Sequence, residues 1–286
     1  MPLAPVTTLG VGGEAEWLIT PTGPGDLVQA LRLCREHGVP WRVLGGGTNL
    51  LVYDGGVSGV VLAPRGICFE YATVAGEQVV AGGALNLAQL LTRAAEWGLS
   101  GLEPLAGIPG TLGGAVVGNA GGRHGDIGSV VSAVVGYTGE GELLRRQGYE
   151  LHFRYRETNL RDLVVTGVEL SLRGGVFGQI LARMAEIIDE RRRTQPLDQR
   201  SAGCFFRNPP GGRSAGELID RAGLKGVRSG GAEISPVHAN YIVNRGGATS
   251  RDILSLVALA RDAVRKQFGV ELELEVQLWS KDGRTA

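Results

Sequence analysis

The sequence predicts an α+β protein with more than one domain. Its 286 residues are 43% hydrophobic, which is typical of globular chains and sufficient for a sizeable core. Strand-like runs and helical stripes alternate up to about residue 172. From residue 176 the pattern changes to a long helix, a polar link and shorter elements, so we expect a domain boundary near 172.

The first unit of this pattern reads as β-α-β. Residues 26–37 are predicted to form a helix that Asp26 can cap. Its apolar stripe at i, i+3, i+4 and i+7 consists of Leu27, Ala30, Leu31 and Cys34. The strand-like runs WRVL (41–44) and VSGVVL (57–62) follow, with a run of three glycines directly after the first of them.

The remaining elements follow from the same periodicities. Gly98 ends a helix at 86–97 and Gly269 ends one at 252–268. The segment 271–279, ELELEVQLW, alternates strictly and predicts one continuous strand. The other predicted elements are a strand pair within 67–81, strands near 130–137, 142–145 and 163–171, a helix at 176–193 and a short helix opened by the capping box Ser214-x-x-Glu217.

Composition limits the functional classes. Twenty-nine basic and 29 acidic residues balance, which gives no argument for a nucleic-acid or membrane-surface partner. No apolar run approaches the ~20 residues that span a bilayer, and the first ten residues do not resemble a signal peptide. The three cysteines form neither a disulfide framework nor a zinc pattern, so we expect a cytoplasmic protein with reduced thiols and no metal.

Two glycine-rich segments are candidate ligand sites. The first, GGGTN at 45–49, reads either as a plain turn or as a concavity of main-chain N–H groups that binds an anion. The second, at 101–128, contains ten glycines and matches neither a Walker A loop nor a G-x-G-x-x-G helix start. A long glycine loop within a domain is usually functional, and a dinucleotide with a pyrophosphate could use both segments.

Six motifs occur in an order that makes the resemblance specific: GGGTNLLV, GIPGTLGGAVVGNAG, FRYRETNL, SAGCFFRNP, LIDRAGLKGVRSGGAEISPVHANYIVN and LELEV. From about Thr8 to Trp279 the chain resembles the UDP-N-acetylenolpyruvoylglucosamine reductase family, flavoenzymes of bacterial cell-wall synthesis. The resemblance implies an FAD-binding fold of the vanillyl-alcohol-oxidase (PCMH) type in two α/β subdomains, plus an α+β substrate-binding domain. The implied divisions are 1–64 joined by the C-terminal strand 271–286, then 65–172, then 173–270.

The resemblance also implies the cofactors and the reaction. NADPH would reduce FAD, and the enolpyruvyl group of the sugar nucleotide would then be reduced to give UDP-N-acetylmuramate. No histidine lies within 45–49 to tether the cofactor, so we expect FAD to be bound non-covalently. The residues that would hold it are Gly45, Gly46, Gly47, Thr48, Asn49, Leu50, Gly107, Ile108, Pro109, Gly110, Thr111, Gly113, Gly114, Gly118, Asn119 and Gly121.

Three residues match the catalytic positions of the family. Arg156 would bind the substrate carboxylate, because a guanidinium stays charged and binds bidentately, although a solvated strand edge is the alternative. Cys204 would donate the proton where many members have serine; a buried structural cysteine is the alternative. Glu275 matches the family glutamate, but periodicity alone does not separate it from Glu273, and an acid role would need burial.

Asn208 and Lys225 match substrate-binding positions, while His238 and Asn240 are expected to hold a turn. The chain lacks the tyrosine-bearing loop of longer members, which leaves Arg207 or Arg213 as candidates for covering the diphosphate. A monomer is favoured. The alternatives are a flavoenzyme of the same fold with another substrate, a non-enzymatic nucleotide-binding module, and an electron relay, which the absence of cysteine clusters disfavours.

Overall fold

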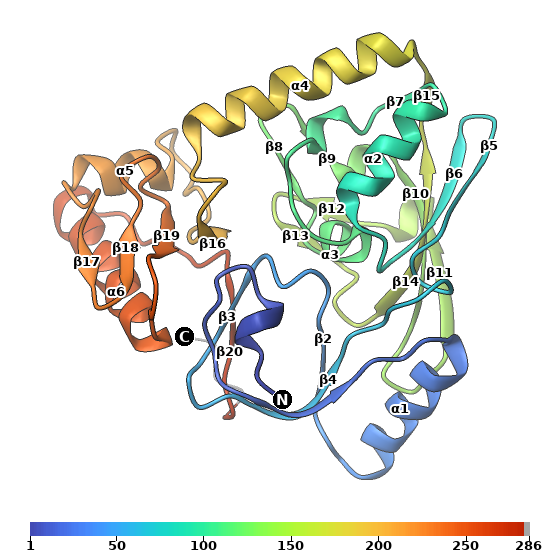
Figure 1. The fold of residues 1–286 in the computed structure, drawn as a ribbon, viewed down its shortest axis with the longest axis horizontal. Helices are drawn as coiled ribbons and strands as arrows, with labels where there is room; N and C mark the ends of the chain where they lie inside the picture. Colours follow the sequence, from blue (N-terminus) through green and yellow to red (C-terminus); the bar gives the residue numbers. More distant parts are fainter. Residues whose placement is uncertain (283–286) are drawn as a thin grey trace. The chain divides into compact units, whose positions relative to one another are not determined.

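The computed structural model describes residues 1–282 (Figure 1). It divides into two compact units. The first consists of residues 1–17, 47–59 and 191 onward, and the second of residues 18–46 and 60–190. The division predicted at 64, 172 and 270 stays a prediction, and its part at 283–286 lies outside the described residues.

The second unit begins with the predicted helix and its neighbouring strands. The helix is α1 (Pro24–Glu36), and its buried stripe includes Leu31 and Cys34 as predicted. Asp26 does not occupy the N-cap: Gly23 does, and the Asp26 carboxylate accepts hydrogen bonds from the Gly23 and Thr22 N–H groups. β2 (Trp41–Val43) pairs in parallel with β4 (Val57–Leu62), which confirms the strand assignments that flank the glycine run.

An antiparallel five-stranded sheet forms the centre of the second unit, in the order β11-β10-β14-β6-β5 (Figure 1). Its strands agree with the predicted runs, although the first begins later than expected. Their bounds are β5 Ala72–Ala75, β6 Gln78–Gly82, β10 Val131–Tyr137, β11 Leu143–Gln147 and β14 Val164–Ser171.

Two capped helices pack with this sheet. The Asn86 side chain accepts hydrogen bonds from the first turn of α2 (Leu87–Glu96), and the Thr111 side chain accepts one from the first turn of α3 (Leu112–Val117). A core cluster that includes Leu90, Val116 and Val168 joins these elements. α4 (Phe177–Thr194) contributes Ile187 to the same cluster.

The first unit contains a four-stranded sheet in the order β16-β19-β18-β17 (Figure 1). The strands are β16 Arg200–Cys204, β17 Arg228–Ser229, β18 Ala232–Ile234 and β19 Tyr241–Asn244. α5 (Ala215–Arg221) begins at the predicted cap Ser214, and α6 (Ser250–Phe268) begins at Thr249 and ends at Gly269. Leu218, Ile242 and Leu256 belong to the core that holds this unit together.

The closing segment differs from the prediction of one continuous strand. Only β20 (Gln277–Trp279) is regular, and it pairs in parallel with β3 (Leu50–Val52) in the N-terminal part of the chain, as the resemblance implied. The preceding residues pair instead with the segment after β16, through an isolated bridge between Phe206 and Leu274. The alternating pattern is uniform, but the chain changes its pairing partner, so the regular strand is short.

Short elements complete the described chain, and none of its helices is long and apolar enough to cross a membrane. The remaining strands are β1 Ala15–Ile19, β7 Leu99–Ser100, β8 Gly121–Gly122, β9 Gly125–Asp126, β12 Phe153–Arg154, β13 Glu157–Thr158 and β15 Arg173–Gly174. The 3₁₀ turns are Ala4–Val6, Glu103–Leu105, Ile127–Ser129 and Gly148–Glu150.

Candidate active site

The start of the first glycine segment lies against the second one within the second unit. A Cβ atom added at Gly45 would lie 2.7 Å from the Thr111 Oγ1 atom, which caps α3. The Gly45 carbonyl accepts a hydrogen bond from Arg65 at 3.0 Å. The structure therefore brings together two segments that are about 65 residues apart in sequence, as a ligand shared between them would require.

Main-chain donors are available in both glycine segments. Within residues 1–282, the N–H groups of Gly45, Gly46, Gly107 and Gly110 donate to no protein acceptor. Gly110 has φ +120°, a conformation that a side chain would strain. Clustered N–H groups without neighbouring Cβ atoms suit an anionic ligand such as a pyrophosphate.

Other glycines of the second segment serve packing instead. The Gly113 N–H group donates to the Gly83 carbonyl at 2.7 Å, and a Cβ atom at Gly113 would approach that oxygen to 2.9 Å. The Gly114 N–H group donates to the Thr111 side chain. Gly113 and Gly114 are therefore explained by close packing at the start of α3, in addition to any contact with a ligand.

Arg156 sits at the tip of the β12–β13 hairpin in the second unit. Its φ of +56° is unusual for a residue with a side chain. The guanidinium donates to the Asn119 carbonyl at 3.2 Å and to the Gly121 carbonyl at 2.9 Å, so it is anchored to the glycine segment. The side chain is half-buried, whereas Arg154 is exposed. The Arg156 guanidinium is therefore fixed by hydrogen bonds to the main chain. It is not a freely solvated side chain on a strand edge.

Asn119 holds the main chain around Arg156 in place. It is buried, has φ +42°, and donates from its side chain to the Arg154 carbonyl at 2.9 Å. Its side-chain oxygen accepts from the Gly128 N–H group at 3.1 Å. This residue was predicted to bind the cofactor; the contacts described here give its side chain a role in shaping the hairpin.

Cys204 is the last residue of β16 in the first unit. The pairing of β16 with β19 shifts register between Ser201 and Cys204, and Gly203 within that bulge has φ +77°. A bulge redirects the following side chain and often lies next to a functional site. The Cys204 side chain is half-buried and lies opposite Tyr241 in the register.

Asn240 holds the chain that follows Cys204. The buried Asn240 side chain donates to the Phe206 carbonyl at 2.8 Å and accepts from the Phe206 N–H group at 2.9 Å. Its main-chain carbonyl accepts from the Phe205 N–H group. Asn240 was expected to hold a turn: its main-chain N–H group does so by donating to His238 Nδ1 at 3.2 Å, whereas its side chain binds the distant main chain of Phe206.

The structure separates the two glutamates that periodicity left equivalent. The Glu273 side chain is 80% exposed and lies 4.0 Å from Arg207. Glu275 is half-buried, and its N–H group donates to the Phe205 carbonyl at 2.8 Å. Its charge acts on the Tyr241 hydroxyl, which also interacts with Cys204. Glu275, Cys204 and Tyr241 thus form one cluster within the first unit.

Tyr241 is the residue of this cluster that the motifs did not single out. It is 8% exposed, and its hydroxyl donates to Gln195 Oε1 at 2.9 Å. Burial, followed by the Cys204 side chain, raises the pKa of Tyr241 far above its ordinary value, with Arg191 opposing. Its position directly across the strand pair from Cys204 becomes visible only once the register is known.

The predicted substrate residues lie on the α5 side of the first unit. The Asn208 side-chain oxygen accepts from the Ala215 N–H group at 3.0 Å, at the start of α5. Lys225 is exposed and pairs with Asp220 at 2.7 Å. Burial, and then the charge of Lys225, lower the pKa of His238, whose ring stands edge-on to Tyr241 at 5.1 Å.

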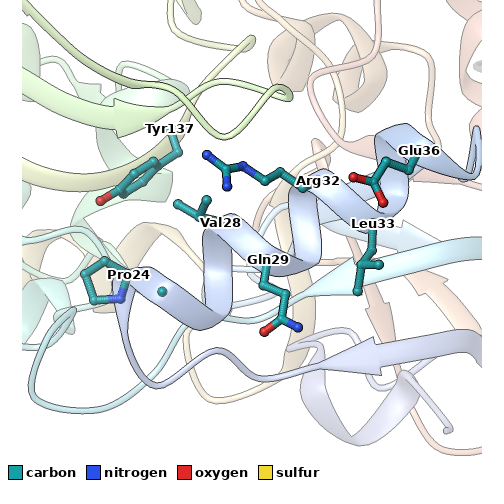
Figure 2. Close-up of a pocket in the computed structure, with 8 residues that line it drawn as sticks. Pro24, Val28, Gln29, Arg32, Leu33, Glu36 and Tyr137 are labelled. Carbon is teal, nitrogen blue, oxygen red and sulfur yellow. The ribbon is translucent and has the colours of Figure 1, made fainter.

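A separate pocket of about 550 Å³ lies beside α1 (Figure 2). Figure 2 shows Val28 and Arg32 on the side of the helix that faces Tyr137, with Gln29 and Leu33 pointing to the other side. None of the predicted site residues lines this pocket. The predicted site residues lie instead at the glycine segments and Arg156 of the second unit, and at the Cys204 cluster of the first unit.

Comparisons with known proteins identify the domains of the chain and its family. The FAD binding domain family matches residues 15–146, and the C-terminal domain of UDP-N-acetylenolpyruvoylglucosamine reductase matches residues 195–279. The first match confirms the predicted FAD-binding fold and cofactor.

Relatives match the chain over almost its whole length. A UDP-N-acetylenolpyruvoylglucosamine reductase of Anaeromyxobacter sp. (strain Fw109-5) is 48% identical over 97% of this chain and 86% of its own. One from Heliobacterium modesticaldum is 42% identical over 99% of this chain and 90% of its own. The crystal structure of UDP-N-acetylenolpyruvylglucosamine reductase (MurB) from Thermus caldophilus superposes with a TM-score of 0.85, at 42% identity and 98% coverage of both chains. The chain therefore belongs to the UDP-N-acetylenolpyruvoylglucosamine reductase family.

Proposed function

We propose that this protein reduces the enolpyruvyl group of UDP-N-acetylglucosamine enolpyruvate with NADPH, giving UDP-N-acetylmuramate for peptidoglycan synthesis. The relatives that carry this activity in their names cover nearly the whole chain, which supports the same activity here. We also propose that the enzyme works in the cytoplasm as a monomer.

The glycine segments fit FAD. Four N–H groups without protein acceptors lie in two segments that touch at Gly45 and Thr111, and this arrangement suits the pyrophosphate of a dinucleotide. When bound, FAD supplies reversible hydride transfer between NADPH and the substrate. We propose non-covalent binding, held mainly by main-chain groups of residues 45–49 and 107–111.

The protein residues stabilise the negative charge that develops on the substrate and supply the proton. Hydride addition to the enolpyruvyl CH₂ carbon sends the electron pair of the double bond onto the adjacent carbon and its carboxylate. We assign Arg156 to hold that carboxylate, because its guanidinium stays charged and is already oriented by two carbonyls. Cys204 then gives its S–H proton to the adjacent carbon, which completes the C–H bond and leaves a thiolate.

Glu275, Asn208 and Lys225 receive supporting roles. We assign Glu275 the role of a second acid near the developing negative charge, because its side chain is half-buried and its N–H group is bonded to Phe205, the residue after Cys204. Asn208 and Lys225 are proposed to contact the sugar nucleotide. Their position near α5 and His238 supports a binding surface that continues from Cys204.

One observation carries the assignment of the proton donor. Cys204 follows a β-bulge and lies opposite the buried Tyr241, whose hydroxyl also feels the charge of Glu275, whereas an ordinary structural cysteine would be surrounded by apolar side chains. A thiol in a polar cluster is suited to proton transfer.

An absorption spectrum of the purified protein tests the proposal. The flavin bands should bleach when NADPH is added without oxygen and return when UDP-N-acetylglucosamine enolpyruvate is added. Bands that ignore the sugar nucleotide would move the assignment to a flavoenzyme of the same fold with another substrate. A colourless protein that takes up no added FAD would contradict the flavin chemistry altogether.

A further inference from the structure

Tyr241 and Cys204 face each other across an antiparallel strand pair. Cys204 ends β16 and Tyr241 begins β19, and the two are register partners immediately after the bulge. Side chains directly opposite each other in such a pair have Cβ atoms about 5 Å apart and lie on the same face. The contact is therefore built into the sheet and does not depend on a mobile loop.

The Tyr241 hydroxyl has two hydrogen-bonding partners. It donates to Gln195 Oε1 at 2.9 Å and is hydrogen-bonded to the Cys204 side chain. A phenol has one proton and two lone pairs, so a hydroxyl that donates to Gln195 accepts from the thiol. Once the thiol has lost its proton, the same hydroxyl can rotate to donate to sulfur.

The surroundings keep this hydroxyl protonated. Burial raises the pKa of Tyr241 well above its ordinary range, and the negative charges of Cys204 and Glu275 act in the same direction when these groups are ionised. Arg191 from α4 opposes them, and the His238 ring packs edge-on without a formal charge of its own. Tyr241 is thus a poor proton source but a dependable hydrogen-bond donor.

We propose that Tyr241, anchored by Gln195, is a positioning residue for the proton donor of this reaction. The inference rests on the proposed role of Cys204. Before proton transfer the hydroxyl accepts from the thiol and orients it. When the S–H bond breaks and the new C–H bond forms on the substrate, the electron pair stays on sulfur, and the Tyr241 hydroxyl turns to donate to the thiolate. Water returns a proton to sulfur before the next turnover.

Thiol alkylation of the FAD-loaded enzyme tests the link between the two residues without relying on turnover. The rate at which iodoacetamide modifies Cys204 is followed against pH by peptide mass spectrometry, which separates Cys204 from the exposed Cys68. In Tyr241→Phe the alkylation curve should move to higher pH, and the rate at pH 7 should fall about tenfold, because the thiolate loses a hydrogen bond.

Matched variants separate positioning from packing. Tyr241→Phe keeps the ring, so a merely structural tyrosine would leave the alkylation curve unchanged, and that result would overturn the proposal. Tyr53→Phe, a partly buried tyrosine on the same core, should leave the curve in place. Reduction of the flavin by NADPH should be unaffected in both variants, which also verifies that they fold and bind FAD.

Reoxidation kinetics tie the contact to the reaction. Tyr241→Phe should slow reoxidation by the sugar nucleotide about tenfold in the parent enzyme and add nothing in a Cys204→Ala background, because the group it positions is gone. Full additivity in the double variant would contradict positioning through Cys204. If Cys204→Ala alone reoxidises at the parental rate, the proposed proton donor is wrong, while the alkylation result still decides whether Tyr241 controls the thiol.

Discussion

The Asn240 side chain and the Phe206 main chain exchange two hydrogen bonds, one donated in each direction, at 2.8 and 2.9 Å. Both residues are buried, so neither bond has water as a substitute. This pair fixes the segment that follows Cys204 and runs beside Glu275.

Asn240→Ala should lower the free energy of unfolding by about 2–3 kcal/mol, because a buried N–H and a buried C=O of Phe206 lose their partner together. Denaturant unfolding of the FAD-loaded protein measures this. Asn244→Ala provides a comparison in which a buried side chain also bridges to main-chain groups, those of Leu9 and Gly10. A change below about 0.5 kcal/mol for Asn240→Ala, the level of a typical surface substitution, would show that the segment is held by other contacts.

Cys204→Ala should leave flavin reduction by NADPH nearly intact and slow reoxidation by the sugar nucleotide by about 10²–10⁴-fold, the usual contribution of a positioned acid. Cys204→Ser should retain part of the rate, because a hydroxyl can donate the same proton less readily. Stopped-flow absorbance separates the two half-reactions. Unchanged reoxidation in Cys204→Ala would place the acid elsewhere.

Glu275→Gln should slow reoxidation about a hundredfold or more, because the amide retains the shape of the side chain but cannot deliver a proton. Glu273→Gln is the matched control, since Glu273 lies two residues away and its side chain is 80% exposed. We expect it to react as the parent does. Equal losses in the two variants would remove the basis for assigning the role to Glu275.

Arg156→Lys should slow the substrate half-reaction by about 10²-fold or more, because an ammonium cannot reproduce the two-pronged hold on a carboxylate while also contacting the Asn119 and Gly121 carbonyls. The exposed Arg154, two residues earlier on the same hairpin, gives the control Arg154→Lys. Single-turnover reoxidation is the measurement. Similar rates for Arg156→Lys and the parent would return Arg156 to a structural role.

Gly45→Ala should weaken FAD binding about tenfold, because its Cβ would approach Thr111 Oγ1 to 2.7 Å and overpacking costs about 1–3 kcal/mol. Titration of the apoprotein with FAD gives the dissociation constant. Gly178→Ala in α4 meets nothing within 4 Å and should leave FAD binding unchanged while stabilising the helix. An unaltered constant for Gly45→Ala would mean that the junction of the glycine segments does not contact the cofactor.

The sequence predicted most regular elements because their causes are local. The stripe of α1 buries Cys34, the capping residues Asn86 and Ser214 begin their helices, and Gly269 ends α6, all within a few residues of the features that identify them. The prediction of one continuous strand over 271–279 was wrong because the length of a strand is not determined locally. The alternating pattern reports which face is buried, but the length of a strand depends on its pairing partner, which changes before Gln277.

The sequence by itself determined the family, the cofactor class and the motif residues, since six ordered motifs and two glycine segments are properties of the chain alone. Only the tertiary structure gave Glu273 and Glu275 different exposure, joined Gly45 to Thr111, and placed Tyr241 opposite Cys204. Burial and strand register arise from contacts between distant parts of the chain. A periodic pattern cannot encode those contacts, because residues on the same face of a strand look alike until the strand has a neighbour.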